Sequence, residues 1–136
     1  MKTLTLEGDI TAVDTRTTLT TQGSVTAPSL VTPANATKIT TIVAACAAEG
    51  LSDGAATFFV RLGGNAVKNG EQVLVVSAAG RIAPQAGSDS APQAMVPIVL
   101  ENLDIEVSAS DTISVSAEMA GSDLGTARPI VTLIFA

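Results

Sequence analysis

Carboxylates are the side chains of this sequence whose types and spacing most nearly suggest chemistry. The most acidic stretch carries Glu101, Asp104, Glu106, Asp111 and Glu118. Oxygen ligands at such spacing can hold calcium, and paired carboxylates can cleave a glycosidic bond. However, the stretch lacks the Asp-x-Asn/Asp-x-Asn/Asp-Gly pattern of a calcium loop, and Glu106 alternates with Ile105 and Val107 as on a strand. We therefore interpret these residues as a solvated strand face.

Two other features could be reactive or could bind a ligand, but each has a simpler interpretation. Cys46 is the single cysteine and lies within the small apolar run 43–48, so we predict a buried thiol that forms no internal disulfide. The glycine-rich segments 63–65 and 121–125 neither open a predicted helix nor continue into Gly-Lys-Ser/Thr, so we predict turns and not phosphate loops.

The residue types that are missing exclude whole classes of function. The chain of 136 residues has no His, Trp or Tyr. Without His it lacks the usual general base and the commonest transition-metal ligand, which excludes His-dependent triads and zinc sites. So few aromatic rings argue against sugar-stacking and base-stacking sites. We predict a protein that is not an enzyme, with no catalytic, cofactor-binding or metal-ligating residues; a carboxylate enzyme is the least favoured hypothesis.

Charge and hydropathy point to protein partners. The net charge is −6, and only 15% of residues are charged. The basic residues are scattered: Lys2, Arg16, Lys38, Arg61, Lys68, Arg81 and Arg128. We therefore predict no direct binding of nucleic acid. A weakly charged surface on a chain of mean hydropathy +0.44 indicates contact with other protein. Arg61 and Arg128 lie on apolar strands, where each either snorkels at a sheet edge or pairs with a carboxylate, including at a subunit contact.

The N-terminus and the apolar runs bear on localisation. Residues 1–9 alternate apolar with polar residues as in a strand, and they do not form the apolar region of a signal peptide. The longest apolar run, 42–48, is too short to cross a bilayer. We therefore expect neither export by the general secretory route nor a membrane span.

Short extended segments separated by turn residues must position all these groups. The predicted strands cover residues 38–48, 55–62, 71–77, 95–100, 103–108, 112–119 and 128–135. In 112–119 every second residue is apolar, as in a strand with one buried face. Asn69-Gly70 predicts a hairpin, and 80–94 predicts a long surface loop. A helix over 42–49 is the alternative to the first strand.

These patterns predict an all-β fold, an antiparallel β-sandwich of jelly-roll type with about eight strands. The segment 128–135 is expected to lie centrally in a sheet because it is uniformly apolar. Residues 1–37 are rich in Thr and are predicted to form an extended N-terminal arm or edge strands, and residues 38–136 the sandwich domain.

The order of these features, an N-terminal arm followed by about eight short strands with long loops, resembles single jelly-roll capsid and capsid-decoration proteins of viruses and phages. The resemblance implies a virion structural protein, made in the host cytoplasm, that forms homo-oligomers such as trimers or pentamers and contacts other capsid proteins. Residues 1–37 hold only Lys2 and Arg16 against Glu7, Asp9 and Asp14, unlike the basic arms that bind RNA genomes. An outer-shell or decoration role fits better. The alternative is an adhesion or ligand-binding module of a surface layer or fibre.

Overall fold

Every regular element of the described chain is a β-strand. The computed structural model describes residues 2–12, 14–21, 30–49, 57–77, 93–94, 97–120 and 126–136. The strands are β1 (Lys2–Glu7), β2 (Thr17–Thr18), β3 (Thr20–Thr21), β4 (Lys38–Glu49), β5 (Thr57–Gly63), β6 (Gln72–Ser77), β7 (Gln93–Ala94), β8 (Ile98–Leu100), β9 (Ile105–Glu106), β10 (Ser114–Ala120) and β11 (Thr126–Phe135). The all-β prediction is confirmed. The alternative of a helix over 42–49 is wrong, because β4 pairs along its length with β11.

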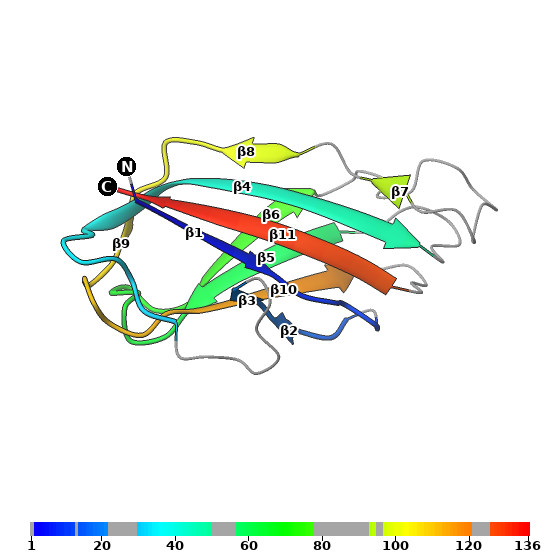
Figure 1. The fold of residues 1–136 in the computed structure, drawn as a ribbon, viewed down its shortest axis with the longest axis horizontal. Coiled ribbons are helices and arrows are strands. Elements are labelled where there is room, and N and C mark those ends of the chain that lie inside the picture. The colour runs from blue at the N-terminus through cyan, green and yellow to red at the C-terminus, as the bar shows by residue number, and fades with distance from the viewer. Residues whose placement is uncertain are drawn as a thin grey trace.

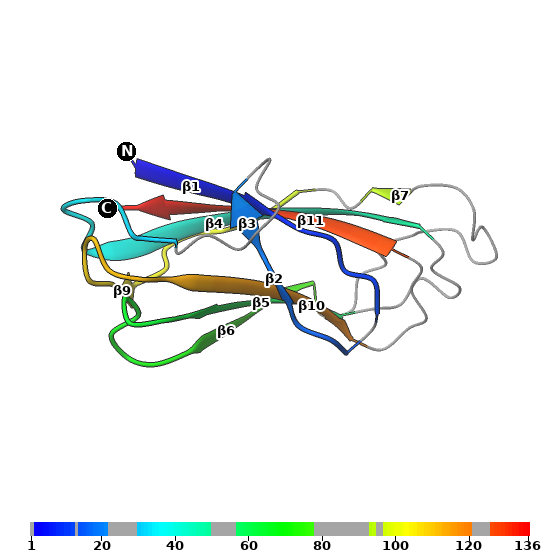
Figure 2. The ribbon, with the colours of Figure 1, turned by 60° about the horizontal axis from the view of Figure 1, so that its bottom comes forward.

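The strands form two sheets packed face to face. The larger sheet has seven strands in the order β3-β1-β11-β4-β7, with β8 and β9 also paired to β4; the smaller has four in the order β2-β10-β5-β6. Figure 1 shows the long strands β4 and β11 side by side, and Figure 2 separates the two layers. The prediction that residues 128–135 lie centrally is confirmed, since β11 pairs with β1 on one side and β4 on the other.

The pairing of distant strands is that of a jelly roll. We count β2 and β3 together as the second strand of the chain, and β7, β8 and β9 together as the sixth strand. The described chain then has eight strand positions. The first then pairs with the eighth (β1 with β11), the second with the seventh (β2 with β10), the third with the sixth (β4 with β8) and the fourth with the fifth (β5 with β6). This nesting is a long hairpin rolled into two sheets, as in jelly rolls.

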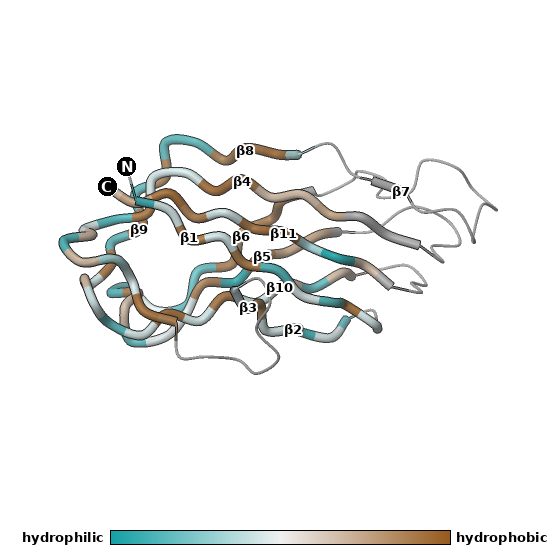
Figure 3. The backbone as a smooth tube through the Cα atoms, viewed as in Figure 1, coloured by the Kyte–Doolittle hydropathy of each residue, from teal (hydrophilic) through white to brown (hydrophobic). Residues whose placement is uncertain are grey.

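The core follows from alternation along these strands. In β10, Val115, Ala117 and Met119 are buried, and the residues between them face outward. In its neighbour β5 the burial alternates too, with Phe58, Val60 and Leu62 buried, although Phe59 between them is also apolar. Figure 3 shows apolar and polar residues interspersed along the strands. Because side chains of successive strand residues point to opposite faces, one face of each sheet closes the core and the other remains available.

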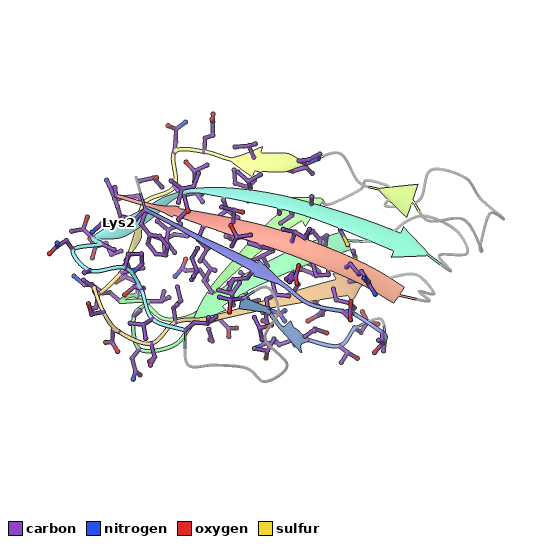
Figure 4. All side chains as sticks on the ribbon, viewed as in Figure 1. Lys2 is labelled. Atoms are coloured by element: carbon purple, nitrogen blue, oxygen red, sulfur yellow. The ribbon has the colours of Figure 1, made fainter. Side chains whose placement is uncertain are left out.

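The N-terminal segment contributes to both sheets. β1 lies between β3 and β11 in the larger sheet, and β2 pairs with β10 in the smaller. Leu6, Ile10 and Leu19 are fully buried in the core. Lys2 donates a hydrogen bond through Nζ to the carbonyl oxygen of Ala34, and Figure 4 places it at the end of the sandwich where the C-terminus lies. The division of the chain at residue 37 stays a prediction.

The hairpin expected at Asn69-Gly70 is present, but its connection is longer than a two-residue turn. β5 pairs antiparallel with β6, and residues 64–71 join them. Gly64 and Gly70 have φ values of 90° and 86°, a region that favours glycine. The connection also places Ala66 and Val67 in the core. The predicted turn at 121–125, and most of the predicted loop 80–94, lie outside the described residues.

Candidate interaction surface

The acidic residues of the 101–118 region do not gather into one metal-binding cluster. Glu101 and Glu106 are exposed. Asp104 contacts Lys38 with Oδ1 3.2 Å from Nζ, and Asp111 accepts a hydrogen bond of 2.8 Å from the backbone N–H of Thr112. Among the described residues, no group of three or more His, Cys, Asp or Glu could hold a metal ion. In the described chain these carboxylates therefore do not provide the oxygen ligands of a metal site.

Cys46 is buried on the inward face of β4, with 2% of its surface exposed, which confirms the prediction of a buried thiol. Burial raises the pKa of the thiol from 9.0 to about 12, and a hydrogen bond with the backbone of Arg128 opposes the rise. At neutral pH the native thiol is therefore protonated and unreactive.

The raised pKa of Cys46 predicts a loss of stability at alkaline pH. Below pH 9 the thiol is protonated in both the folded and the unfolded chain, so its contribution to the free energy of unfolding is fully present. As the pH rises from 9.0 to about 12, the unfolded chain ionises first and the free energy of unfolding falls. The expected slope is on the order of 1 kcal/mol per pH unit. Urea titrations of the unmodified chain and of Cys46→Ala should therefore diverge in this window; parallel curves would contradict this origin of the effect.

A partly buried ion pair lies on the outward face of the smaller sheet. Arg61 on β5 donates from Nη1 to Oε1 of Glu118 on β10 at 2.7 Å, and the side chains are only 19% and 15% exposed. The guanidinium carbon lies 5.9 Å from the centre of the Phe59 ring. The Nε of Arg61 is buried without a hydrogen-bond partner. Of the two arginines singled out from the sequence, Arg61 is thus desolvated, whereas Arg128 forms an exposed pair with Asp9 at 3.2 Å.

Removing one partner of this pair should cost more than breaking an exposed one. Glu118→Ala leaves the Arg61 charge half-desolvated, so we expect the free energy of unfolding to fall by about 1–3 kcal/mol. The matched control is Glu71→Ala, which breaks the exposed pair with Arg16 at 3.2 Å, where we expect less than about 1 kcal/mol. Urea unfolding of both variants measures the difference, and equal losses would show that burial does not strengthen the Arg61–Glu118 contact.

Apolar side chains surround this pair and remain open to solvent. Val73 and Val75 on β6 are 49% and 45% exposed. The register places Arg61 beside Val73 and Phe59 beside Val75, so all four side chains point outward. We call the surface of Phe59, Val73 and Val75 the β5–β6 face.

The outward side of the larger sheet carries a second apolar surface. Val99 on β8 lies directly beside Val43 on β4. Ile130 and Ile134 on β11 are the diagonal neighbours of Val43. Val99 and Ile130 are 49% and 47% exposed, and Val43 and Ile134 are half-buried. We call the surface of these four residues the β4–β11 face.

Thr132 interrupts the β4–β11 face between Ile130 and Ile134, and its hydroxyl pairs with that of Thr5 on β1. Thr132 of β11 lies beside Val43 on one side and Thr5 of β1 on the other. The Oγ1 atoms of Thr5 and Thr132 are 3.0 Å apart, within hydrogen-bond distance. When a protein partner desolvates a surface, the free-energy cost is smaller if the polar groups of that surface are already hydrogen-bonded. The arrangement is chemically suited to contact with protein.

Comparison with known proteins gives a likeness among solved structures. No protein-family model and no curated protein matches the chain. Among solved structures, it is similar to a chain of the "Structure of infectious bursal disease virus Gx strain". The identity is 10%, the TM-score is 0.42, and the match covers 99% of this chain and 32% of that one. This chain therefore spans about a third of the virus chain, and the assignment of the fold rests on the strand order described above.

Neither apolar face was identified from the sequence. The sequence signal for the β5–β6 face was the apolar run 73–76, and the signal for the β4–β11 face was the pair of apolar runs 130–131 and 133–135. A strand with one solvated face would instead alternate apolar and polar residues. Residues 42–48 are the longest apolar run, yet Val43 and Ala45, which point outward from β4, are only half-buried in the described chain. In the described ranges, no helix has the length and apolar character needed to span a membrane.

Proposed function

We propose that this chain is a non-enzymatic virion structural protein, a capsid or capsid-decoration subunit, that acts by assembling with copies of itself and with other shell proteins. The observation that carries the proposal is that both sheets present apolar residues outward. Val73 and Val75 on one side and Val99 and Ile130 on the other are each 45–49% exposed. Contiguous exposed apolar surface on a folded domain is typical of interaction sites.

The arrangement of the β4–β11 face supports an interface. Val43 stands at its centre, in contact range of Val99 and of the two isoleucines of β11. Burying apolar surface contributes about 25 cal/mol per Å² removed from water. Thr5 and Thr132 add no charge to this face, whereas Glu7 on β1 lies beside Ile130 at its edge. The centre of an interface is depleted in charge and enriched in apolar side chains, and the two residues directly beside Val43, Val99 and Thr132, are uncharged.

The proposal is tested by placing charge on the β4–β11 face. In the double variant Val99→Lys/Ile130→Lys, assembly would have to desolvate two ammonium groups. We therefore expect the association constant to fall at least about tenfold. Sedimentation velocity of the full chain across a concentration series measures this. The matched control is Val31→Lys, whose valine is 46% exposed elsewhere in the sandwich.

The outcomes separate the proposal from its rival. Assembly of the unmodified chain and of Val31→Lys, with loss in the double variant, is the expected result. If the unmodified chain stays monomeric and does not join a partner shell, the proposed function is wrong. A specific hit on a glycan array from such a monomer would favour the adhesion or ligand-binding module.

A further inference from the structure

We propose that β6 pairs antiparallel with β6 of a second copy across a two-fold axis, so that two four-stranded sheets join into one continuous sheet. This inference rests on the proposed function, because it names the partner for one edge of the assembling subunit. It is carried by the position of β6 in the sheet order, by its composition and by its register.

β6 is the long free edge of the described sandwich. It ends the order β2-β10-β5-β6 and, within the part of the chain that the structure describes, pairs only with β5. The other edge strands of the described chain are β2, β3, β7, β8 and β9, each of two or three residues. Because β3 covers only Leu6 and Glu7 of β1, the stretch Lys2–Thr5 is a second, shorter open edge, and it carries the charge of Lys2. Short edge strands protect a sheet from edge-to-edge pairing, whereas the six residues of β6 offer a row of backbone donors and acceptors.

The composition of β6 offers little protection against pairing. Its sequence Gln-Val-Leu-Val-Val-Ser contains no charged residue, proline or glycine. Proteins that keep an edge monomeric place lysine, proline or an inward charge there. The one irregularity is a register shift opposite Phe58 and Phe59 that leaves Val76 as an extra residue. The regular part, residues 72–75, remains available for a partner strand.

The register of the pair follows from the faces of the strand. Directly opposed residues of an antiparallel pair point to the same side of the sheet. A two-fold axis at Leu74 therefore opposes Leu74 to itself, inward, and Val73 of one copy to Val75 of the other, outward. The four exposed valines then form one cross-strand cluster, continuous with Phe59 of each copy, which lies beside Val75.

The charges near β6 do not oppose this pairing. In that register Glu71 of one copy meets position 77 of the other, so the two glutamates are kept apart. Glu71 is also paired with Arg16 in its own subunit, and Arg61 with Glu118. The charges of Glu71 and Arg61 are therefore neutralised within each copy.

Charge reversal on β6 tests the inference. We expect Val73→Lys/Val75→Lys and Val73→Glu/Val75→Glu each to lose association at this edge, at least about tenfold, because like charges would be opposed across the axis. A mixture of the two variants should recover association, because each lysine then meets a glutamate. Circular dichroism confirms folding, and Val31→Lys is the control at a matched valine. If the lysine variant sediments like the unmodified chain, or the mixture of folded variants does not recover, the pairing of β6 is wrong.

Disulfide trapping tests the register without adding charge. Opposed residues of an antiparallel pair have Cα atoms about 4.5–5.5 Å apart, within the range that a disulfide spans. A Val73→Cys chain mixed with a Val75→Cys chain should form the mixed disulfide faster than either forms one alone, with Val31→Cys as the control. Equal rates would overturn the register. If the unmodified chain does not associate at all, the proposed function fails; if it associates but shows neither charge rescue nor the mixed disulfide, only the inference about β6 fails.

Discussion

A chain from which residues 1–37 have been removed is expected not to fold. The deletion removes β1 from the larger sheet and β2 from the smaller, together with the fully buried Leu6, Ile10 and Leu19. Truncating one buried Leu or Ile to Ala costs about 2–5 kcal/mol, and a typical domain has only about 5–15 kcal/mol of stability. The loss of three such side chains and the β1–β11 ladder exceeds that margin.

Far-UV and near-UV circular dichroism with thermal unfolding measures this result. The graded control is Leu6→Ala, for which we expect a folded chain with a free energy of unfolding lower by about 2–5 kcal/mol. The half-buried Leu4, on the same face of β1, should give a smaller loss when changed to Ala. A truncated chain that still unfolds cooperatively would show that the N-terminal segment is an arm and not part of the core.

Substitution of Gly64 is expected to have the second largest effect. Its φ of 90° is unfavourable for any side chain, and a Cβ there would lie 2.7 Å from the backbone oxygen of Thr112 and 3.0 Å from the backbone nitrogen of Ser114. These contacts are to backbone, so relief requires β10 and the 64–71 connection to separate. Strain and overpacking each cost about 1–3 kcal/mol, so Gly64→Ala should lower the free energy of unfolding by about 2–6 kcal/mol.

Gly70 in the same connection provides a close control. Its φ is 86°, but a Cβ there would meet nothing within 4 Å. Gly70→Ala therefore carries the backbone strain without the collision, and we expect a loss of about 1–2 kcal/mol. Urea unfolding of both variants separates the two contributions. Equal losses would mean that the approach of Gly64 to Thr112 does not constrain the fold.

Local pattern was sufficient to predict the longer strands of residues 38–136, whereas the predicted strand 103–108 contains only the two strand residues of β9. The strict alternation in 112–119 gave β10, and the apolar run 128–135 gave a central strand, because both signals depend only on which faces of a strand are buried. The sandwich followed from the number of such segments and the turn residues between them. The first strand, 38–48, was left between strand and helix because alanine favours helix, and pairing with β11 decides it.

The features that make the candidate surfaces depend on contacts between distant residues. Thr-rich residues 2–7 suit an arm as well as an edge strand, and only the β1–β11 ladder places Leu6 in the core. The Arg61–Glu118 pair joins residues 57 positions apart. The exposure of Val73 and Val75 depends on β6 being the last strand of its sheet. A sequence pattern reports burial of a strand face, and it does not report the order of strands in a sheet.

We propose that this sandwich functions through surfaces that meet other protein, first of all other copies of itself. Static light scattering of the unmodified full chain, over a concentration series through the micromolar range, tests it most directly. We expect the weight-average mass to rise above the 13.6 kDa of one chain towards a defined multiple or a larger particle. A mass that stays at 13.6 kDa at every concentration, both alone and with candidate shell proteins, would contradict the claim.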